Sequence, residues 1–145
     1  MVIVLDVDGV LNDGTVYLDT KGNEVMKAWN VKDGQGIINA VDAGHTVVLA
    51  SGKHSAYIAA RAEQLGCMAM PVRSNDKLSS VREICASLGV ALGDIAYMGD
   101  DTPDDAVLAE VGAAIVPADH ANLVNWIYRT PFDGGRGAVR YALDR

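Results

Sequence analysis

The chain has few of the features that mark secreted, membrane-bound or nucleic-acid-binding proteins. It contains only two cysteines, with no CxxC pair, and two such thiols are expected to stay free in a reducing compartment. No apolar run approaches the about 18 residues needed to span a membrane, and no basic segment suggests a signal peptide. Lys and Arg number 12 against 19 Asp and Glu, giving a net charge of -7. This balance argues against binding to nucleic acids or anionic membranes, and a cytoplasmic location is expected.

Internal repeats, low-complexity tracts and Pro- or Ser-rich linkers are also absent from the sequence. A length of 145 residues, 50% of them hydrophobic, predicts one domain, residues 1–145, with a sizeable core. Strand-like runs alternate with helix-like patterns along the chain. This alternation is typical of βαβ units, so we expect an α/β fold with a parallel sheet flanked by helices.

The positions of the elements follow from apolar periodicity and from turn residues. Strands are expected at about 2–6, 46–50, 68–70, 95–98 and 113–116, and a hairpin over 15–29 with its turn at 19–22. Helices are expected from an N-cap at Asp33 to a stop at Gly44, over 55–65, from Asn75 or Asp76, and after Pro103. The histidines His45, His54 and His120 show no ligand spacing, and Trp29 and Trp126 are expected to pack.

Two carboxylates follow the first strand directly, in the run Asp6-Val7-Asp8-Gly9. A buried strand that ends this way places both carboxylates at the carboxyl edge of the sheet, where ligands bind in open α/β folds. Residues two apart on a strand share a face. One carboxylate can then attack while the other moves a proton, and a cation can balance their charge.

Three further strand ends carry polar residues that parallel strands bring to the same edge. Ser51-Gly52-Lys53 follow the second strand, Lys77 opens a helix after the third, and Gly99-Asp100-Asp101 follow the fourth. Carboxylates this close would repel one another, and a divalent cation resolves that conflict. Oxygen ligands favour Mg²⁺, which is usually held by one or two carboxylates and a substrate phosphate. No role is assigned to Asp101, Asp104 and Asp105.

Each of these segments alone also fits a purely structural role. Asp6 to Gly9 can be an acidic turn, Ser51-Gly52 a strand-end turn, and Asp100-Asp101 a turn with capping carboxylates. Lys77 can be a solvated residue of a first helical turn. Only their common order after successive strands favours a reactive site.

The four segments, in this order, resemble the haloacid dehalogenase (HAD) superfamily of phosphatases. The chain is similar to the capless branch that contains 3-deoxy-manno-octulosonate 8-phosphate phosphatases and nonulosonate 9-phosphate phosphatases. The stretches that carry the branch resemblance are 6–14, 30–34, 99–101 and the glycine-rich tail 134–140. The resemblance implies a Rossmann-like HAD fold with a β-hairpin flap after the first strand and no cap domain.

The resemblance also implies a role for each matching residue. Asp6 would be the nucleophile that forms an aspartyl-phosphate, and Asp8 the general acid and later the base. Mg²⁺ would bind the Asp6 carboxylate, the Asp8 backbone carbonyl and Asp100, while Ser51 and Lys77 would hold the phosphoryl group. The residues that would contact the substrate are Asp8, Asn30, Val31, Lys32, Asp33, Gly34, Ser51, Gly52, Lys53, Arg61, Lys77 and Arg136.

The expected activity is Mg²⁺-dependent hydrolysis of a phosphorylated sugar acid. The resemblance also implies a homotetramer in which the tail reaches a neighbouring subunit's site. Arg136 would there meet the substrate carboxylate as a fork. Two departures from the family pattern concern the substrate: Lys53 stands where Arg is common, and Ile38 where octulosonate enzymes tend to have Arg. The alternatives are a phosphatase of another small sugar phosphate and a non-catalytic acidic metal-binding module, although the spacing of 6–9 does not fit a calcium loop.

Overall fold

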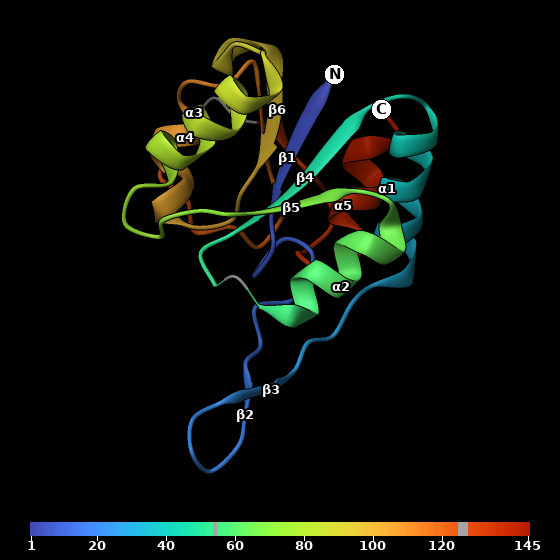
Figure 1. Cartoon of the computed structure of the whole chain (residues 1–145), viewed down its shortest axis with the longest axis vertical. Coiled ribbons are helices and arrows are strands. Elements are labelled where there is room, and N and C mark those ends of the chain that lie inside the picture. Colours follow the sequence, from blue (N-terminus) through green and yellow to red (C-terminus); the bar gives the residue numbers. More distant parts are fainter. Residues whose placement is uncertain (54, 125–127) are drawn as a thin grey trace.

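A six-stranded sheet forms the centre of the computed structural model, which describes residues 1–53, 55–124 and 128–145 (Figure 1). The strand order is β5-β4-β1-β6-β7-β8, and every neighbouring pair is parallel. The strands are β1 (Val2–Asp6), β4 (Thr46–Ser51), β5 (Met68–Pro71), β6 (Ile95–Met98), β7 (Ala113–Val116) and β8 (Tyr128–Arg129). The predicted α/β fold is confirmed. Strand β8 was not predicted, because two residues are too short to show a period. The predictions for His54 and Trp126 lie outside the described residues.

Helices cover both faces of the sheet, because alternate residues of β1 point to opposite sides. Ile3 and Leu5 belong to one core cluster with α1 (Val31–Asp42), α2 (Ala56–Leu65) and α5 (Ala138–Leu143). Val2 and Val4 belong to the other, with α3 (Lys77–Leu88) and α4 (Asp105–Leu108). Trp29 packs against the first cluster, as expected. None of the helices formed by the described residues combines the length and hydropathy needed to cross a membrane.

Strand β1 lies between β4 and β6, so the chain winds outward from β1 in both directions. In register, Asp6 at the end of β1 pairs with Ala50, and Leu5 pairs with Met98. The loops that follow β1, β4 and β6 therefore leave the sheet side by side. A crevice forms where neighbouring loops diverge like this, and it is the usual ligand site of such sheets.

A two-stranded flap stands between β1 and α1 and projects beyond the sheet (Figure 1). It consists of β2 (Tyr17–Leu18) and β3 (Glu24–Met26), which pair antiparallel. Asp19 organises the turn, since its carboxylate accepts hydrogen bonds from the backbone N–H groups of Lys21 and Asn23. The predicted hairpin is confirmed with shorter strands, and residues 7–30 contain no cap domain.

The first residues of α1 differ from the prediction. The N-cap is Asn30, whose side-chain oxygen accepts from the N–H groups of Lys32 and Asp33. The prediction of Asp33 as the cap was wrong, because Asn30 satisfies the free N–H groups one turn earlier.

Asp33 instead binds the C-terminal tail, 104 to 107 residues away in the sequence. Its carboxylate is buried and accepts hydrogen bonds from the backbone N–H groups of Gly137, at 3.1 Å, and Arg140, at 2.8 Å. Burial raises the pKa of Asp33, while these N–H groups oppose the rise. Asp33 therefore provides α5 with the cap that the glycine at its own N-terminus cannot supply.

We expect Asp33→Asn to lower the free energy of unfolding by about 1–3 kcal/mol, because the amide nitrogen turns a donor toward backbone donors in a buried site. Urea denaturation measures this loss, and proteolysis should begin in the tail. Asp42→Asn, at the exposed end of the same helix, is the matched control. Equal stability of the two variants would contradict the tail-anchoring role.

Candidate active site

The predicted strand-end residues converge on one cleft at the carboxyl edge of the sheet. Its volume is about 240 Å³. The lining residues are Asp6, Asp8, Ser51, Gly52, Lys53, Ser74, Lys77, Asp100, Asp101 and Pro103. Seven of the predicted site residues thus lie together, contributed by the ends of β1, β4 and β6 and by the start of α3. All of its lining residues except Gly52 and Pro103 have polar or charged side chains.

Lys77 links the nucleophile candidate to a second buried carboxylate. Its ammonium nitrogen lies 3.0 Å from Asp6 Oδ2 and 2.8 Å from Asp104 Oδ1. Asp104 also accepts from the hydroxyl of Tyr97, at 2.6 Å, and from the backbone N–H groups of Asp100 and Asp101. Burial lowers the pKa of Lys77, but the charges of Asp6 and Asp104 outweigh it and hold the pKa above its ordinary value. Lys77 therefore stays charged.

Three carboxylates approach closely enough to hold a metal ion. One oxygen from each of Asp6, Asp100 and Asp104 lies within 4.8 Å of the others. Asp104 already accepts four hydrogen bonds, whereas the Asp100 carboxylate accepts none from the described residues. Gly9 permits this placement of Asp100, because a Cβ at Gly9 would collide with that carboxylate. Asp6 and Asp100 thus fit a hard cation such as Mg²⁺ better than Asp104 does.

The pKa values of the same carboxylates reflect their crowding. Burial, and then the charge of Asp104, raises the pKa of Asp6 to about 6 even though Lys77 opposes the rise. Burial and the charges of Asp6 and Asp104 raise the pKa of Asp100 to about 7. A divalent cation would reverse both shifts, since it stabilises the ionised carboxylates.

Asp8 is held in a different environment from Asp6. Its Oδ1 accepts from the side chain of Asn12, at 2.8 Å, and from the ammonium of Lys27, at 2.7 Å. Burial raises the pKa of Asp8, but these donors outweigh burial and the pKa lies below its ordinary value. The two carboxylates of the first motif are therefore separated in pKa by their surroundings, as expected when they have different tasks.

The loop after β4 supplies neutral and positive groups. The hydroxyl of Ser51 is buried at the strand end and accepts from the N–H of Lys53, at 3.2 Å. The side chain of Lys53 is close enough for its charge to lower the pKa of Asp8. Gly52 packs against Ser74, because a Cβ there would collide with the Ser74 hydroxyl.

The remaining predicted substrate contacts lie outside this cleft. Asn30, Gly34 and Arg61 line a small hollow beside Trp29, and the Arg61 guanidinium lies over Gly34. Val31 and Lys32 are exposed on the first turn of α1, and Asp33 is engaged by the tail as described above.

Arg136 lines a separate cavity of about 300 Å³ with Asn12, Asp13 and Asn30. Its side chain is 69% exposed and lies 3.5 Å from Asp13. The glycines before it pack on the loop that follows β1 in the same chain, since the N–H of Gly135 donates to Val10 O and a Cβ at Gly134 would meet Gly9 O.

Three residues of the site were not predicted as such. Asp104 was left without a role, although its position four residues after Asp100 on a capped turn is a usable signal. Tyr97 lies inside an apolar strand, and nothing in the pattern separates it from core residues. Lys27 lies 19 residues from Asp8, and only the flap brings the two together.

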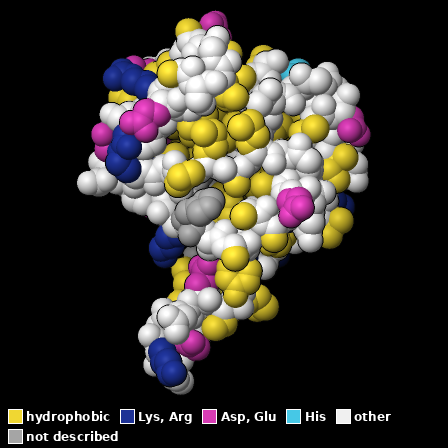
Figure 2. All heavy atoms as spheres, viewed as in Figure 1, with side chains coloured by type: hydrophobic (Ala, Val, Ile, Leu, Met, Phe, Trp, Pro, Cys, Tyr) yellow, Lys and Arg dark blue, Asp and Glu magenta, His cyan; other side chains and the backbone are white. Residues whose placement is uncertain are grey.

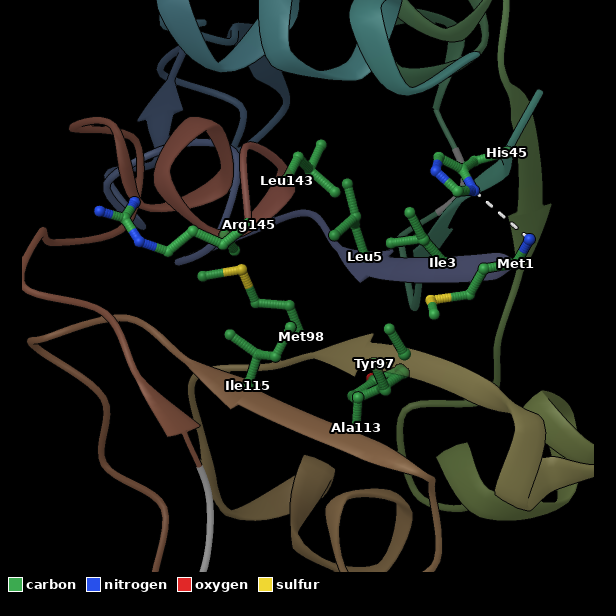
Figure 3. Close-up of a pocket in the computed structure, with 12 residues that line it drawn as sticks. Met1, Ile3, Leu5, His45, Tyr97, Met98, Ala113, Ile115, Leu143 and Arg145 are labelled. Atoms are coloured by element: carbon green, nitrogen blue, oxygen red, sulfur yellow. Dashed lines mark hydrogen bonds between the residues drawn. The ribbon is translucent and has the colours of Figure 1, made fainter. Parts of the chain in front are cut away.

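A larger cavity than the cleft lies on the face of the sheet that α5 partly covers (Figure 3). It measures about 380 Å³ and is lined mainly by apolar residues of β1, β6, β7 and α5. Leu5, Met98, Ile115 and Leu143 border the same space. Among the described residues, those that line it include His45 and Arg145 but no Asp or Glu.

Comparison with known proteins shows which family the chain resembles. No family model matches the chain. The 3-deoxy-D-manno-octulosonate 8-phosphate phosphatase KdsC of Yersinia pestis is 37% identical over 144 residues, which cover 98% of this chain and 76% of that protein. KdsC of Escherichia coli (strain K12) has the same identity and coverage.

Two solved structures of related proteins resemble the fold of this chain. A 3-deoxy-D-manno-octulosonate 8-phosphate phosphatase from Moraxella catarrhalis, in complex with magnesium, phosphate and KDO, superposes with a TM-score of 0.90 at 33% identity and covers 99% of this chain and 83% of that one. A putative HAD superfamily hydrolase from Legionella pneumophila gives a TM-score of 0.87 at 34% identity, covering 99% and 79%.

The fold and the cleft define a hydrolase of the HAD superfamily. Within that superfamily, the chain belongs to the family of the KdsC phosphatases.

Replacement of Asp100 tests the repulsion among the carboxylates of the cleft. Because the pKa of Asp100 is raised from 3.8 to about 7, its contribution to stability falls as the pH rises through that window. We expect metal-free Asp100→Asn to melt higher than the wild type at pH 8, by about 2–4 °C for each kcal/mol relieved, with a smaller difference at pH 5. Thermal melting measures this.

Mg²⁺ should raise the melting temperature of the wild type and leave that of Asp100→Asn unchanged. Asp94→Asn, an exposed carboxylate outside the cleft, is the control and should match the wild type in both conditions. A variant that melts below the wild type at pH 8 without metal would argue against repulsion at Asp100.

Proposed function

We propose that the chain is a Mg²⁺-dependent phosphomonoesterase that hydrolyses a phosphorylated sugar acid through an aspartyl-phosphate on Asp6. The observation that carries the proposal is the cleft itself, where the buried residues Asp6 and Lys77 converge with Asp100. Asp8 lines the same cleft as a candidate acid–base group. KdsC relatives named as octulosonate 8-phosphate phosphatases favour that substrate class over a nonulosonate 9-phosphate.

In the first step an Asp6 oxygen attacks phosphorus, and the bond from phosphorus to the sugar oxygen breaks. Asp8 gives its proton to the departing alkoxide. Negative charge on an incoming phosphate dianion favours this protonated form of Asp8, opposing the donors that hold its pKa low. Lys77 and Ser51 bind the phosphoryl oxygens and keep the group in line, which is most of what phosphoryl transfer requires.

In the second step water attacks phosphorus, the bond from Asp6 to phosphorus breaks and Asp8 takes the proton from water. Mg²⁺ held by Asp6 and Asp100, with the Asp8 carbonyl, would neutralise charge on the phosphoryl oxygens. The environment of Asp8 suits both tasks, because its side chain is half-exposed in the cleft and can donate a proton to the leaving group and accept one from water.

Substrate contacts outside the cleft are part of the same proposal. Lys53 at its edge and Arg136 beyond Asn12 are cations that a sugar-acid carboxylate can meet. A neutral sugar phosphate offers these cations no carboxylate, so it is the weaker candidate.

A homotetramer is the proposed assembly. The flap carries the exposed apolar side chains Val16, Leu18, Val25 and Met26, and hydrophobic side chains surround the base of the projecting flap in Figure 2. Exposed apolar clusters of this kind are typical of interfaces. Arg136 of one subunit would then serve a neighbouring cleft. A cytoplasmic location is proposed because Cys67 and Cys85 are free thiols.

Replacement of the nucleophile tests the chemistry. Asp6→Asn should reduce release of inorganic phosphate from 3-deoxy-octulosonate 8-phosphate by at least about 10³-fold, since the amide cannot form the phosphoenzyme. The wild type should lose activity in EDTA and regain it with Mg²⁺. Full wild-type activity in EDTA, or a folded Asp6→Asn variant within tenfold of the wild type, would refute the mechanism.

Arg136→Ala tests the substrate carboxylate contact better than deletion of the tail, which would remove the buried residues Ala138 and Val139. Loss of a charge-assisted hydrogen bond should raise KM for the sugar-acid phosphate about tenfold or more. Hydrolysis of an aryl phosphate should be unchanged. Arg82→Ala, an exposed arginine on α3, is the control.

Mixing Arg136→Ala subunits with Asp6→Asn subunits should restore part of the low KM if Arg136 acts across subunits. Sedimentation measures the assembly in parallel. A monomer, or no recovery on mixing, would restrict Arg136 to its own chain.

A further inference from the structure

Lys27 of the flap is buried against the acid–base residue of the cleft. Its side chain is only 3% exposed, although it follows directly after the largely exposed strand β3. The ammonium lies 2.7 Å from Asp8 Oδ1 and 3.2 Å from Glu24 Oε2. A lysine that loses its hydration in this way requires both carboxylates as partners. The flap is thereby tied to the loop that carries the catalytic residues.

Asn12 fixes the same oxygen of Asp8 from the other side. The Asn12 side-chain oxygen accepts from the backbone N–H groups of Gly9, at 3.1 Å, and Gly14, at 2.9 Å. These two donors determine which end of the amide is oxygen, so its nitrogen must point at Asp8 Oδ1, 2.8 Å away. Asp8 Oδ1 consequently receives two donors and has no room for a proton of its own.

The other oxygen, Oδ2, accepts no hydrogen bond from the described residues. The Asp8 side chain is 40% exposed and lines the cleft. Only Oδ2 is left to carry a proton toward a substrate.

We propose that Lys27 is a positioning residue of the flap: with Asn12 it fixes Asp8 by Oδ1, so that Oδ2 alone delivers the proton to the leaving sugar oxygen and later takes one from water. The inference rests on the proposed function and adds to it the atom that moves the proton and the flap residue that aims it. When the bond from phosphorus to the sugar oxygen breaks, the Oδ2–H bond breaks and that proton forms the alcohol. In the second step the proton from water returns to Oδ2.

The test compares leaving groups in Lys27→Met, which keeps the length of the side chain and removes the charge. The value of kcat/KM reports the steps up to departure of the alcohol. For the sugar-acid phosphate, whose alkoxide needs a proton, kcat/KM should fall about 10²-fold, the usual contribution of a general acid. For 4-nitrophenyl phosphate, whose leaving group needs no proton, it should fall less than about threefold. Asp8→Asn should show the same selective loss.

Lys21→Met, at the exposed tip of the flap, is the matched control and should behave as wild type on both substrates. Glu24→Gln keeps Lys27 but weakens one of its two ion pairs, so kcat/KM for the sugar-acid phosphate should fall less than in Lys27→Met. This variant tests the positioning role even if Lys27→Met does not fold. Lys27→Arg should recover part of the sugar-acid rate.

Equal losses on both substrates, or no loss on either, would overturn the positioning role while leaving the phosphatase proposal intact. A wild type that hydrolyses neither substrate with Mg²⁺ would overturn both.

Discussion

The repulsion among carboxylates at the carboxyl edge of the sheet is the constraint on which the cleft depends. Asp6, Asp100 and Asp104 approach within a few ångströms, and uncompensated charges at that distance would be expelled into water or protonated. Lys77 prevents this on one side by binding Asp6 and Asp104 together. The Asp100 carboxylate accepts no hydrogen bond from the described residues, and burial together with the charges of Asp6 and Asp104 raises its pKa to about 7.

The carboxylate of Asp104 is fixed by hydrogen bonds and in turn positions the charged groups around it. Its four donors include Tyr97 from the centre of β6 and two backbone N–H groups of the loop that carries Asp100. The same carboxylate thus orients Lys77 and shapes the loop. Buried polar groups with every lone pair satisfied are rigid, and this rigidity holds Lys77 beside Asp6 Oδ2.

Connections between distant parts of the chain complete the site. The tail reaches back to α1, where Asp33 caps α5, and its glycines lie on the loop after β1. The flap returns Lys27 to Asp8. The tail glycines and Lys27 both contact the loop of Asp8 and Asn12 from outside the sheet. Glycine is required in the tail because a Cβ at Gly134 or Gly135 would collide with the loop backbone.

The sequence by itself determined the α/β class, the flap and the positions of five strands, because apolar periods and strand ends are local patterns. It also determined the convergence of Asp6, Asp8, Ser51, Lys77 and Asp100, because parallel topology brings the carboxyl ends of strands together. Tertiary structure alone decided the sixth strand, the true cap of α1 and the partners of Asp33, Asp104 and Lys27. Those residues act through contacts with segments remote in sequence or through competition among nearby caps. No spacing rule encodes such contacts, since they depend on where the packed core places each loop.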